Sequence, residues 1–148
     1  MITLSVLVFC SSFYARTEFD FKIAANKTTL VLGNSHPEHS INDSKLNHVY
    51  NLAQSGSAYF YDYLKLREII KYNPHINHVV LGYSYTDIHS KMDSWFNGNN
   101  QIKHKFRNFF FLLDFKDYLE VFKANPKGTL LSTPQTIFQN LIRKFIGF

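Results

Sequence analysis

The sequence predicts an α/β domain with a short parallel sheet, followed by a helical C-terminal region rich in aromatic residues. Three short apolar runs carry this prediction: Thr28–Gly33, His48–Ala53 and His78–Gly82. Each run holds β-branched or aromatic residues and ends near glycine and small polar residues, which is typical of buried strands. Segments with helical spacing separate the runs, and strands that alternate with helices pair in parallel through right-handed crossovers.

Residues 1–14 form an apolar segment ahead of this domain. The segment is shorter than the roughly 20 residues that a membrane-spanning helix needs, and it has no basic start. Phe9 before Cys10 argues against a lipoprotein cleavage site, where a small residue is expected. We interpret residues 1–27 as the remnant of an export signal or membrane anchor with a polar connector, and an ordinary edge element is the alternative. An exported or membrane-associated location in the cell envelope follows, and a cytoplasmic location stays open.

The first strand leads into the turn Gly33-Asn34-Ser35. Such a turn holds a serine hydroxyl at the carboxyl end of a sheet, beside the amides of a helix N-terminus, as a nucleophilic serine requires. A helix cap is the alternative, since Ser and Asn both cap well. Pro37 suits the first turn of a helix, so we expect a short helix from Glu38 to about Leu46.

The second strand is followed by the turn Gln54–Ser57, and Ser57 is expected to cap a helix from Ala58 to about Tyr72. Apolar and aromatic residues recur at helical spacing along that segment. Asn73-Pro74 ends it, and a third buried strand follows. All three strands therefore end in small polar loops, and ligands of parallel sheets bind beyond such ends.

The remaining chain, residues 91–148, is predicted to be a polar loop up to Asn100 and then helical. An amphipathic helix or helix pair is expected over 102–123 and a last helix over 136–148, with a break at Asn125–Gly128. The whole net charge of +5 lies here, because residues 101–148 carry eight Lys and Arg against three Asp and Glu. These cations are interleaved with Phe and Leu, which argues against nucleic acid and favours a face for a membrane or partner.

The cysteine and histidine pattern predicts no metal site, and we expect no cofactor. Cys10 is the single cysteine, so an internal disulfide is excluded. The pairs His36/His39 and His75/His78 have the spacing of metal ligands, but no cysteine or carboxylate set completes either pair. We interpret them as surface or capping residues.

Three motifs stand at the ends of the predicted strands: Gly33-Asn34-Ser35, Gly56, and Gly82-Tyr83-Ser84. In order and spacing they resemble the Gly-Asp-Ser, glycine and Gly-x-Asn blocks of the SGNH (GDSL-like) hydrolase superfamily. This superfamily includes exported or membrane-anchored members that act on acyl groups of cell-envelope glycans. The resemblance covers residues 28–87 and implies a three-layer α/β/α fold of flavodoxin-like type, with residues 28–90 as its core.

The resemblance implies that Ser35 is the nucleophile and that the amides of Ser35 and Gly56 donate to the oxyanion. Ser84 stands where the family has an asparagine donor, and the loss of one such donor costs on the order of 100- to 1000-fold in rate. His36 is an auxiliary candidate that would orient substrate or act as base. The implied substrate is an acylated glycan or other ester, with O-acetyl groups on an envelope polysaccharide favoured, and hydrolysis and transfer both stay open.

The family's catalytic Asp-x-x-His block has no counterpart here. The last histidines are His89 and His104, and neither has an aspartate three residues before it. A serine at its free pKa is a poor nucleophile and needs a base. We therefore expect the chain to be the front part of a longer protein or a natural truncation. The alternative function is a non-catalytic binding or assembly module attached to a membrane or partner.

Overall fold

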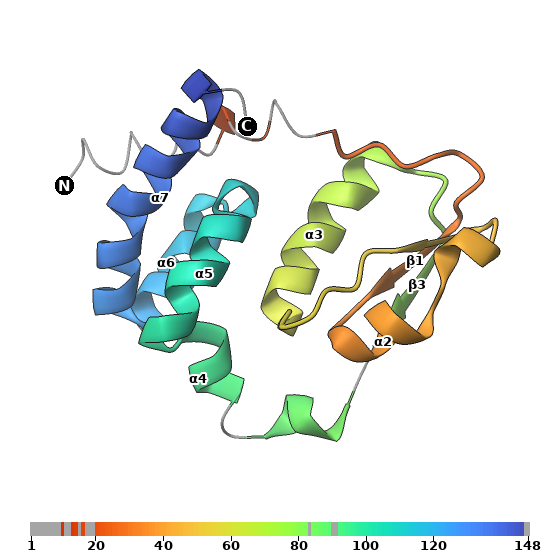
Figure 1. Cartoon of the computed structure of the whole chain (residues 1–148), viewed down its shortest axis with the longest axis horizontal. Coiled ribbons are helices and arrows are strands. Elements are labelled where there is room, and N and C mark those ends of the chain that lie inside the picture. Colours follow the sequence, from red (N-terminus) through yellow and green to blue (C-terminus); the bar gives the residue numbers. More distant parts are fainter. Residues whose placement is uncertain are drawn as a thin grey trace. The chain divides into compact units, whose positions relative to one another are not determined.

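The computed structural model describes Cys10, Phe13–Tyr14, Arg16 and residues 20–82, 84–89 and 92–146. The chain divides into two compact units. Residues 21–92 form one, which we call the α/β unit, and residues 1–20 with 93–148 form the other, the helical unit. Figure 1 shows the strands together with α2 and α3, and the helices α5 to α7 as a separate group. The predicted mixed α/β class is confirmed.

A three-stranded parallel sheet with the order β2–β1–β3 forms the centre of the α/β unit. The strands are β1 (Thr29–Leu32), β2 (Val49–Asn51) and β3 (His78–Leu81). In their register, Leu30 of β1 lies opposite Tyr50 on one side and Val79 on the other. The prediction that the three apolar runs pair in parallel is therefore confirmed.

Burial differs sharply between the central strand and β3. Leu30, Val31 and Leu32 are at most 1% exposed, whereas Val79 and Val80 are 43% and 45% exposed. The prediction of a buried third strand is therefore wrong for these residues. β3 lies at the edge of the sheet, and no strand of the described part of the chain pairs with its outer side. The apolar sequence of β3 does not distinguish an edge strand from a central strand.

The first predicted helix is divided into two shorter ones. α2 spans Ser35–Ser40, and the 3-10 helix η1 spans Asp43–Lys45. Each begins after an asparagine whose side chain accepts a hydrogen bond from the second following amide: Asn34 from His36 at 2.9 Å and Asn42 from Ser44 at 3.1 Å. The helix therefore starts three residues earlier than predicted, because the first asparagine caps it and Pro37 is tolerated inside its first turn.

The next helix, α3 (Tyr59–Tyr72), follows Ala58, which makes no side-chain cap. The predicted cap by Ser57 is wrong, because the Ser57 hydroxyl instead donates to the carboxylate of Asp62 at 2.8 Å. Asp62 also pairs with the buried Lys65 ammonium at 2.8 Å. That ammonium donates to the Leu52 carbonyl at 3.1 Å, so the pair ties α3 to the segment that leaves β2.

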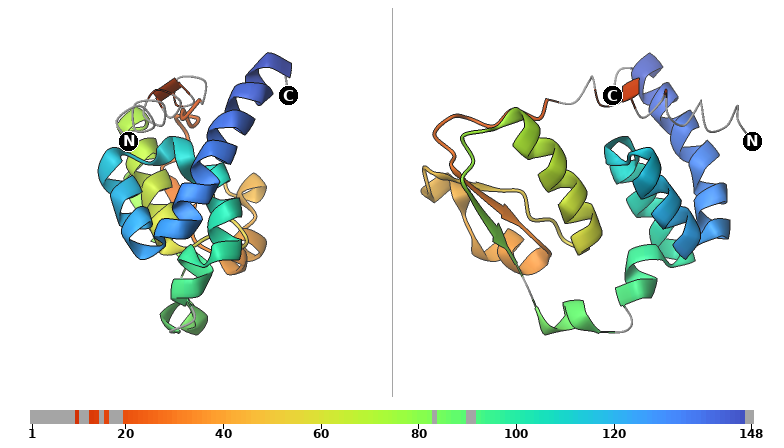
Figure 2. Two further views of the ribbon diagram at one scale, coloured as in Figure 1. Left: turned by 90° about the vertical axis from the view of Figure 1, so that its left-hand side faces the viewer. Right: turned by 180° about the vertical axis from the view of Figure 1, so that it is seen from behind.

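The α-helices α4 to α7 follow the α/β unit in the chain, and Figure 2 shows α5, α6 and α7 side by side. They are α4 (Met92–Asn97), α5 (Asn99–Phe109), α6 (Phe115–Ala124) and α7 (Pro126–Ile146), with the 3-10 helix η3 (Phe110–Leu112) between α5 and α6. Aromatic packing fills the core: the rings of Phe106 and Phe110 lie 5.0 Å apart.

Two predicted boundaries in this unit are wrong. The segment 91–100, expected to be a loop, contains the helix α4. A tertiary contact stabilises this helix, because the side chain of buried Asn97 donates to the Val121 carbonyl at 3.3 Å. The last helix begins at Pro126 rather than at 136. Proline fits there because the first helical residue needs no amide partner. The expected break at Asn125 is therefore a sharp turn between two helices.

No helix in the described part of the chain is long and apolar enough to cross a membrane. The predicted anchor at residues 1–14 lies outside the described residues except for Cys10, Phe13 and Tyr14.

Candidate functional site

The structure brings the three predicted loops together at the carboxyl end of β1. The amide of Gln54, in the second loop, donates to the Gly33 carbonyl at 3.0 Å, and the amide of Gly82 donates to the Leu32 carbonyl at 2.8 Å. Gly33 has a positive φ of 135°, a conformation that strongly favours glycine. The first loop thus contacts the second directly, and the third loop is bound to the last residue of β1.

A proline packs against the glycines of the first and third loops. A Cβ atom on Gly82 would lie 2.4 Å from Cγ of Pro37, and one on Gly33 would lie 2.9 Å from the same atom. Glycine at both positions therefore lets α2 approach the strand ends closely. The sequence prediction used Pro37 only as a marker of a helix start, and missed this contact.

Ser35 is the first residue of α2 and is half-buried. Its amide belongs to the first turn, where no intrahelical carbonyl accepts the N–H groups. No hydrogen bond involves the Ser35 hydroxyl among the described residues. The predicted nucleophile is therefore placed at a helix N-terminus, and the capping role falls to Asn34 instead.

The second loop is fixed to α2 by Glu38, which sequence reasoning did not single out. Its carboxylate accepts from the Ser55 amide at 2.6 Å and from the Ser55 hydroxyl. These hydrogen bonds, the one from the hydroxyl foremost, hold the pKa of Glu38 below its usual value. Gly56 follows directly, with a φ of 74° that favours glycine. Glu38 lies one turn after Ser35, and that spacing puts both on one side of the helix.

In the third loop, Ser84 is bound to Asp87. The Ser84 hydroxyl and amide donate to one carboxylate oxygen at 2.6 and 2.8 Å. The same hydroxyl accepts from Nδ2 of Asn34 at 3.3 Å. Ser84 is therefore close to the Ser35 turn, as predicted, but its proton is directed to Asp87. The spacing Ser84-x-x-Asp87 is that of a capping box, which is the signal that could have identified Asp87.

A polar hollow of about 470 Å³ lies beside α2. Its lining residues are Glu38, His39, Ile41, Asn42, Asp43, Asn51 and Ala53. Asn51 contacts two other parts of the lining. Its side chain donates to the Ile41 carbonyl at 2.8 Å, and its backbone N–H donates to the Asp43 carboxylate at 2.9 Å. Carboxylate and amide side chains thus line the hollow, and Asn42, Asp43 and Asn51 are engaged in local hydrogen bonds.

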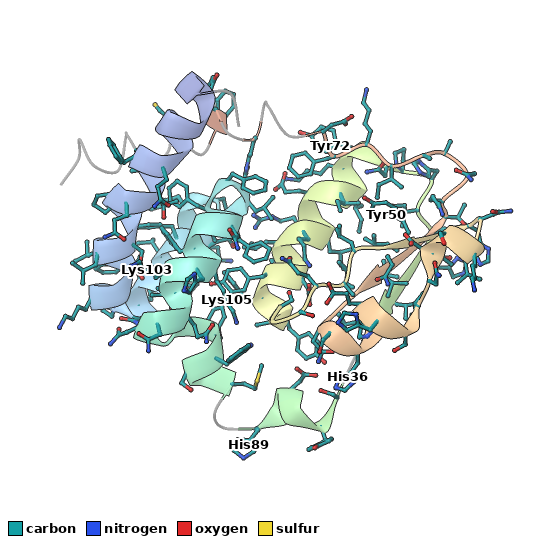
Figure 3. The ribbon with its side chains drawn as sticks, viewed as in Figure 1. His36, Tyr50, Tyr72, His89, Lys103 and Lys105 are labelled. Carbon is teal, nitrogen blue, oxygen red and sulfur yellow. The ribbon has the colours of Figure 1, made fainter. Side chains whose placement is uncertain are left out.

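The auxiliary candidate His36 is exposed on α2 (Figure 3). Neither it nor another described histidine is hydrogen-bonded to Ser35. The described residues also contain no group of three His, Cys, Asp or Glu side chains able to hold a metal ion.

No family model, curated protein or solved structure matches this chain. The functional interpretation therefore depends on the residues and on their geometry.

Proposed function

We propose that the α/β unit carries the acyl-transfer site of an SGNH-like serine esterase or O-acyltransferase. The observation that supports this most is the meeting of Gly33-Asn34-Ser35 with the Gln54–Gly56 loop and with Ser84 at the end of β1. The strand order β2–β1–β3 matches the beginning of a flavodoxin-like sheet. The proposal therefore includes a three-layer α/β/α architecture.

In this mechanism the Ser35 hydroxyl attacks the carbonyl carbon of an acyl ester. The amides of Ser35 and Gly56 donate to the oxyanion, which such donors stabilise because they are already oriented. Ser84 donates as a third group only if its hydroxyl rotates away from Asp87. A base from outside the described residues takes the Ser35 proton and returns it to the leaving alcohol. No cofactor is required.

The proposed substrate is an acyl ester of a cell-envelope polysaccharide, with O-acetyl favoured. The polar hollow next to α2 supports a hydroxyl-rich acceptor, because carboxylate and amide side chains line it. Its residue Glu38 also contacts the second loop, so the hollow adjoins the loops that would hold the ester. An exported or membrane-associated location agrees with this substrate.

A fluorophosphonate probe tests the nucleophile in the protein expressed from its natural full-length gene. We expect the probe to label the wild type and not the Ser35→Ala variant. Ser40→Ala is the matched control, because Ser40 lies on the same helix and its hydroxyl donates to the His36 carbonyl. That variant should keep its labelling. Equal labelling of wild type and Ser35→Ala would refute the proposal.

The alternative function is a non-catalytic module held on an anionic membrane surface, and one observation favours it. Leu131 and Phe138 on α7 are 63% and 64% exposed. They are seven residues apart and so share a face of the helix. Lys127 on the same helix is exposed, and basic residues interleaved with apolar ones suit an anionic interface.

Sedimentation with phosphatidylglycerol vesicles tests this alternative. The wild type should pellet with the vesicles, and the double variant Leu131→Ser/Phe138→Ser should not. Leu46→Ser, at an exposed leucine of the α/β unit, is the control and should still bind. A wild type that stays in the supernatant at low salt would contradict the membrane module.

A further inference from the structure

We infer that Asn34 and Asp87 form a positioning pair that locks the Ser35 turn to the third loop. The inference rests on the proposed function in one respect, namely that Ser35 is the reactive residue being positioned. The pair itself is defined by contacts alone. Nδ2 of Asn34 lies 3.1 and 3.4 Å from the two carboxylate oxygens of Asp87.

The side chain of Asn34 connects two parts of the site. Its oxygen accepts from the His36 amide at 2.9 Å and so caps the helix that begins with Ser35. Its nitrogen donates to Asp87, which belongs to the 3-10 helix η2 (Tyr85–Ile88). One amide group therefore fixes the start of α2 relative to the third loop, and Ser35 is the next residue in the chain.

Capping alone does not explain an amide at position 34. Aspartate, serine and asparagine cap helices about equally well. An aspartate here would bring a second carboxylate to about 3 Å from Asp87, where two like charges cannot both ionise. A serine would cap the helix, but its side chain has no N–H group to donate to Asp87. Asparagine alone among these residues satisfies both ends.

Local structure accounts for only part of the bonding of Asp87. Its bonds from the amide and hydroxyl of Ser84 lie within one short segment, and the bond from the amide is one half of a capping box. The bond from Asn34 spans 53 residues of sequence and is not needed for that box. The carboxylate thus collects donors from two loops, and hydrogen bonds to a charged group are the stronger ones.

A charge-swap cycle tests the pair: Asn34→Asp, Asp87→Asn and the double variant, each measured by urea unfolding from pH 4 to pH 8. The double variant restores one amide and one carboxylate with exchanged positions. We expect both single variants to have lower urea midpoints than the wild type at pH 7, and the double variant to recover most of the loss.

The pH dependence separates repulsion from a general loss of structure. In Asn34→Asp the two carboxylates share a proton in the folded state, so the folded pKa of one is raised. The stability that this variant loses relative to wild type is therefore small near pH 4 and grows as the pH rises toward 7. The titratable groups on the elements that meet here include His36, Glu38 and His39 on α2, Tyr59 on α3, Tyr85 on η2 and His89 after it. Every variant retains them. The difference from wild type thus reports the pair.

Asn42→Asp is the matched control for the single change. Asn42 caps η1 in the same way, with its oxygen accepting from the Ser44 amide at 3.1 Å. We expect a clearly smaller growth of the stability loss toward pH 7 in this variant, because the Asn42 side chain is hydrogen-bonded to Ser44 and to no carboxylate. An equal pH-dependent deficit in Asn42→Asp and Asn34→Asp would overturn the inference, as would a double variant that recovers nothing.

The rate of fluorophosphonate labelling at pH 7 tests positioning. We expect Asn34→Asp to react about tenfold or more slowly, since displacing a reacting group by about 1 Å can cost about 100-fold. The double variant should recover most of that rate. Normal labelling of both single variants, with none in Ser35→Ala, would overturn the positioning pair and leave the proposed nucleophile intact. Labelling of Ser35→Ala would refute the proposed function, and the urea cycle would still decide whether the pair exists.

Discussion

Gly82 lies so close to Pro37 that a single methyl group does not fit between them. A Cβ atom at position 82 would stand 2.4 Å from Cγ of the proline ring, well inside van der Waals contact. We expect Gly82→Ala to lower the free energy of unfolding by about 1–3 kcal/mol, the usual cost of overpacking. Urea unfolding measures it.

The double variant Pro37→Ala/Gly82→Ala provides the control for this contact. Removing the ring relieves the clash, so the double variant should lose less stability than the sum of the two single variants. The two residues touch, and touching residues typically show coupling of about 0.5–3 kcal/mol. Strict additivity would contradict the close packing of α2 on the third loop.

Lys105 is a cation in an unfavourable environment within the helical unit, and Figure 3 labels it beside the exposed Lys103 on α5. Its side chain is buried, its ammonium donates to the Trp95 carbonyl at 2.7 Å, and it lies 4.8 Å from the centre of that indole ring. Burial lowers the pKa of Lys105 from 10.5 to about 8.

Stability should therefore rise with pH above 8. Between the folded pKa of about 8 and the unfolded value of 10.5, the unfolded chain holds a proton that the folded chain has lost. The free energy of unfolding then increases with pH, by about 1–3 kcal/mol at most for one such group. Lys105→Met should remove this rise between pH 7.5 and 9.5, and Lys103→Met should keep it. A wild type with no rise would contradict the lowered pKa.

At the scale of elements, β1 and β3 have similar sequences and different surroundings. Val31 and Val80 lie opposite each other in the register, yet they are 1% and 45% exposed. We expect Val31→Ala to cost about 2–3 kcal/mol, because it leaves a cavity in the core. Val80→Ala should cost less than about 1 kcal/mol.

Thermal or urea unfolding of the two variants measures that contrast. The substitutions remove the same atoms from the same kind of strand, so their difference reports burial alone. Equal costs would mean that β3 is covered in solution, contrary to its exposure here.

The strands and the longer helices were predicted, but α4 was missed and several element ends were misplaced. The apolar runs identified all three strands, because β-branched residues bounded by glycine and polar turns have few alternatives. The ends of α2 and α7 were misplaced by local chemistry: Asn34 competes with later residues for the cap, and Pro126 starts a helix where it was expected to end one. Ser57 was misassigned because its hydroxyl donates a hydrogen bond to Asp62, five residues away, instead of capping α3.

At the scale of the whole molecule, each compact unit has its own buried core. Leu64 on α3 and Ile102 on α5 are both fully buried, at 0% exposure. We expect Leu64→Ala to reduce amide-exchange protection chiefly in residues 29–81. Ile102→Ala should reduce it chiefly in residues 99–139, since proteins open in cooperative units that follow packing.

Native-state hydrogen exchange followed by mass spectrometry checks this assignment. The two changes are matched, because each removes a branched aliphatic chain and costs about 2–5 kcal/mol in a core. Equal loss of protection in both units from either change would contradict two separate cores.

The sequence by itself determined the fold class, the three parallel strands and the loops in which Ser35, Gly56 and Ser84 stand. These features depend on local patterns of polarity and on turn residues, which are encoded within a few positions. Only the tertiary structure decided that β3 lies at an edge, that Pro37 packs on Gly82, and that Asn34 donates to Asp87. Each of these depends on segments that are far apart in the chain, so no local pattern encodes it. The turn that carries Ser35 can therefore be predicted from the sequence, whereas the distant residues that hold it in place are known only from the folded structure.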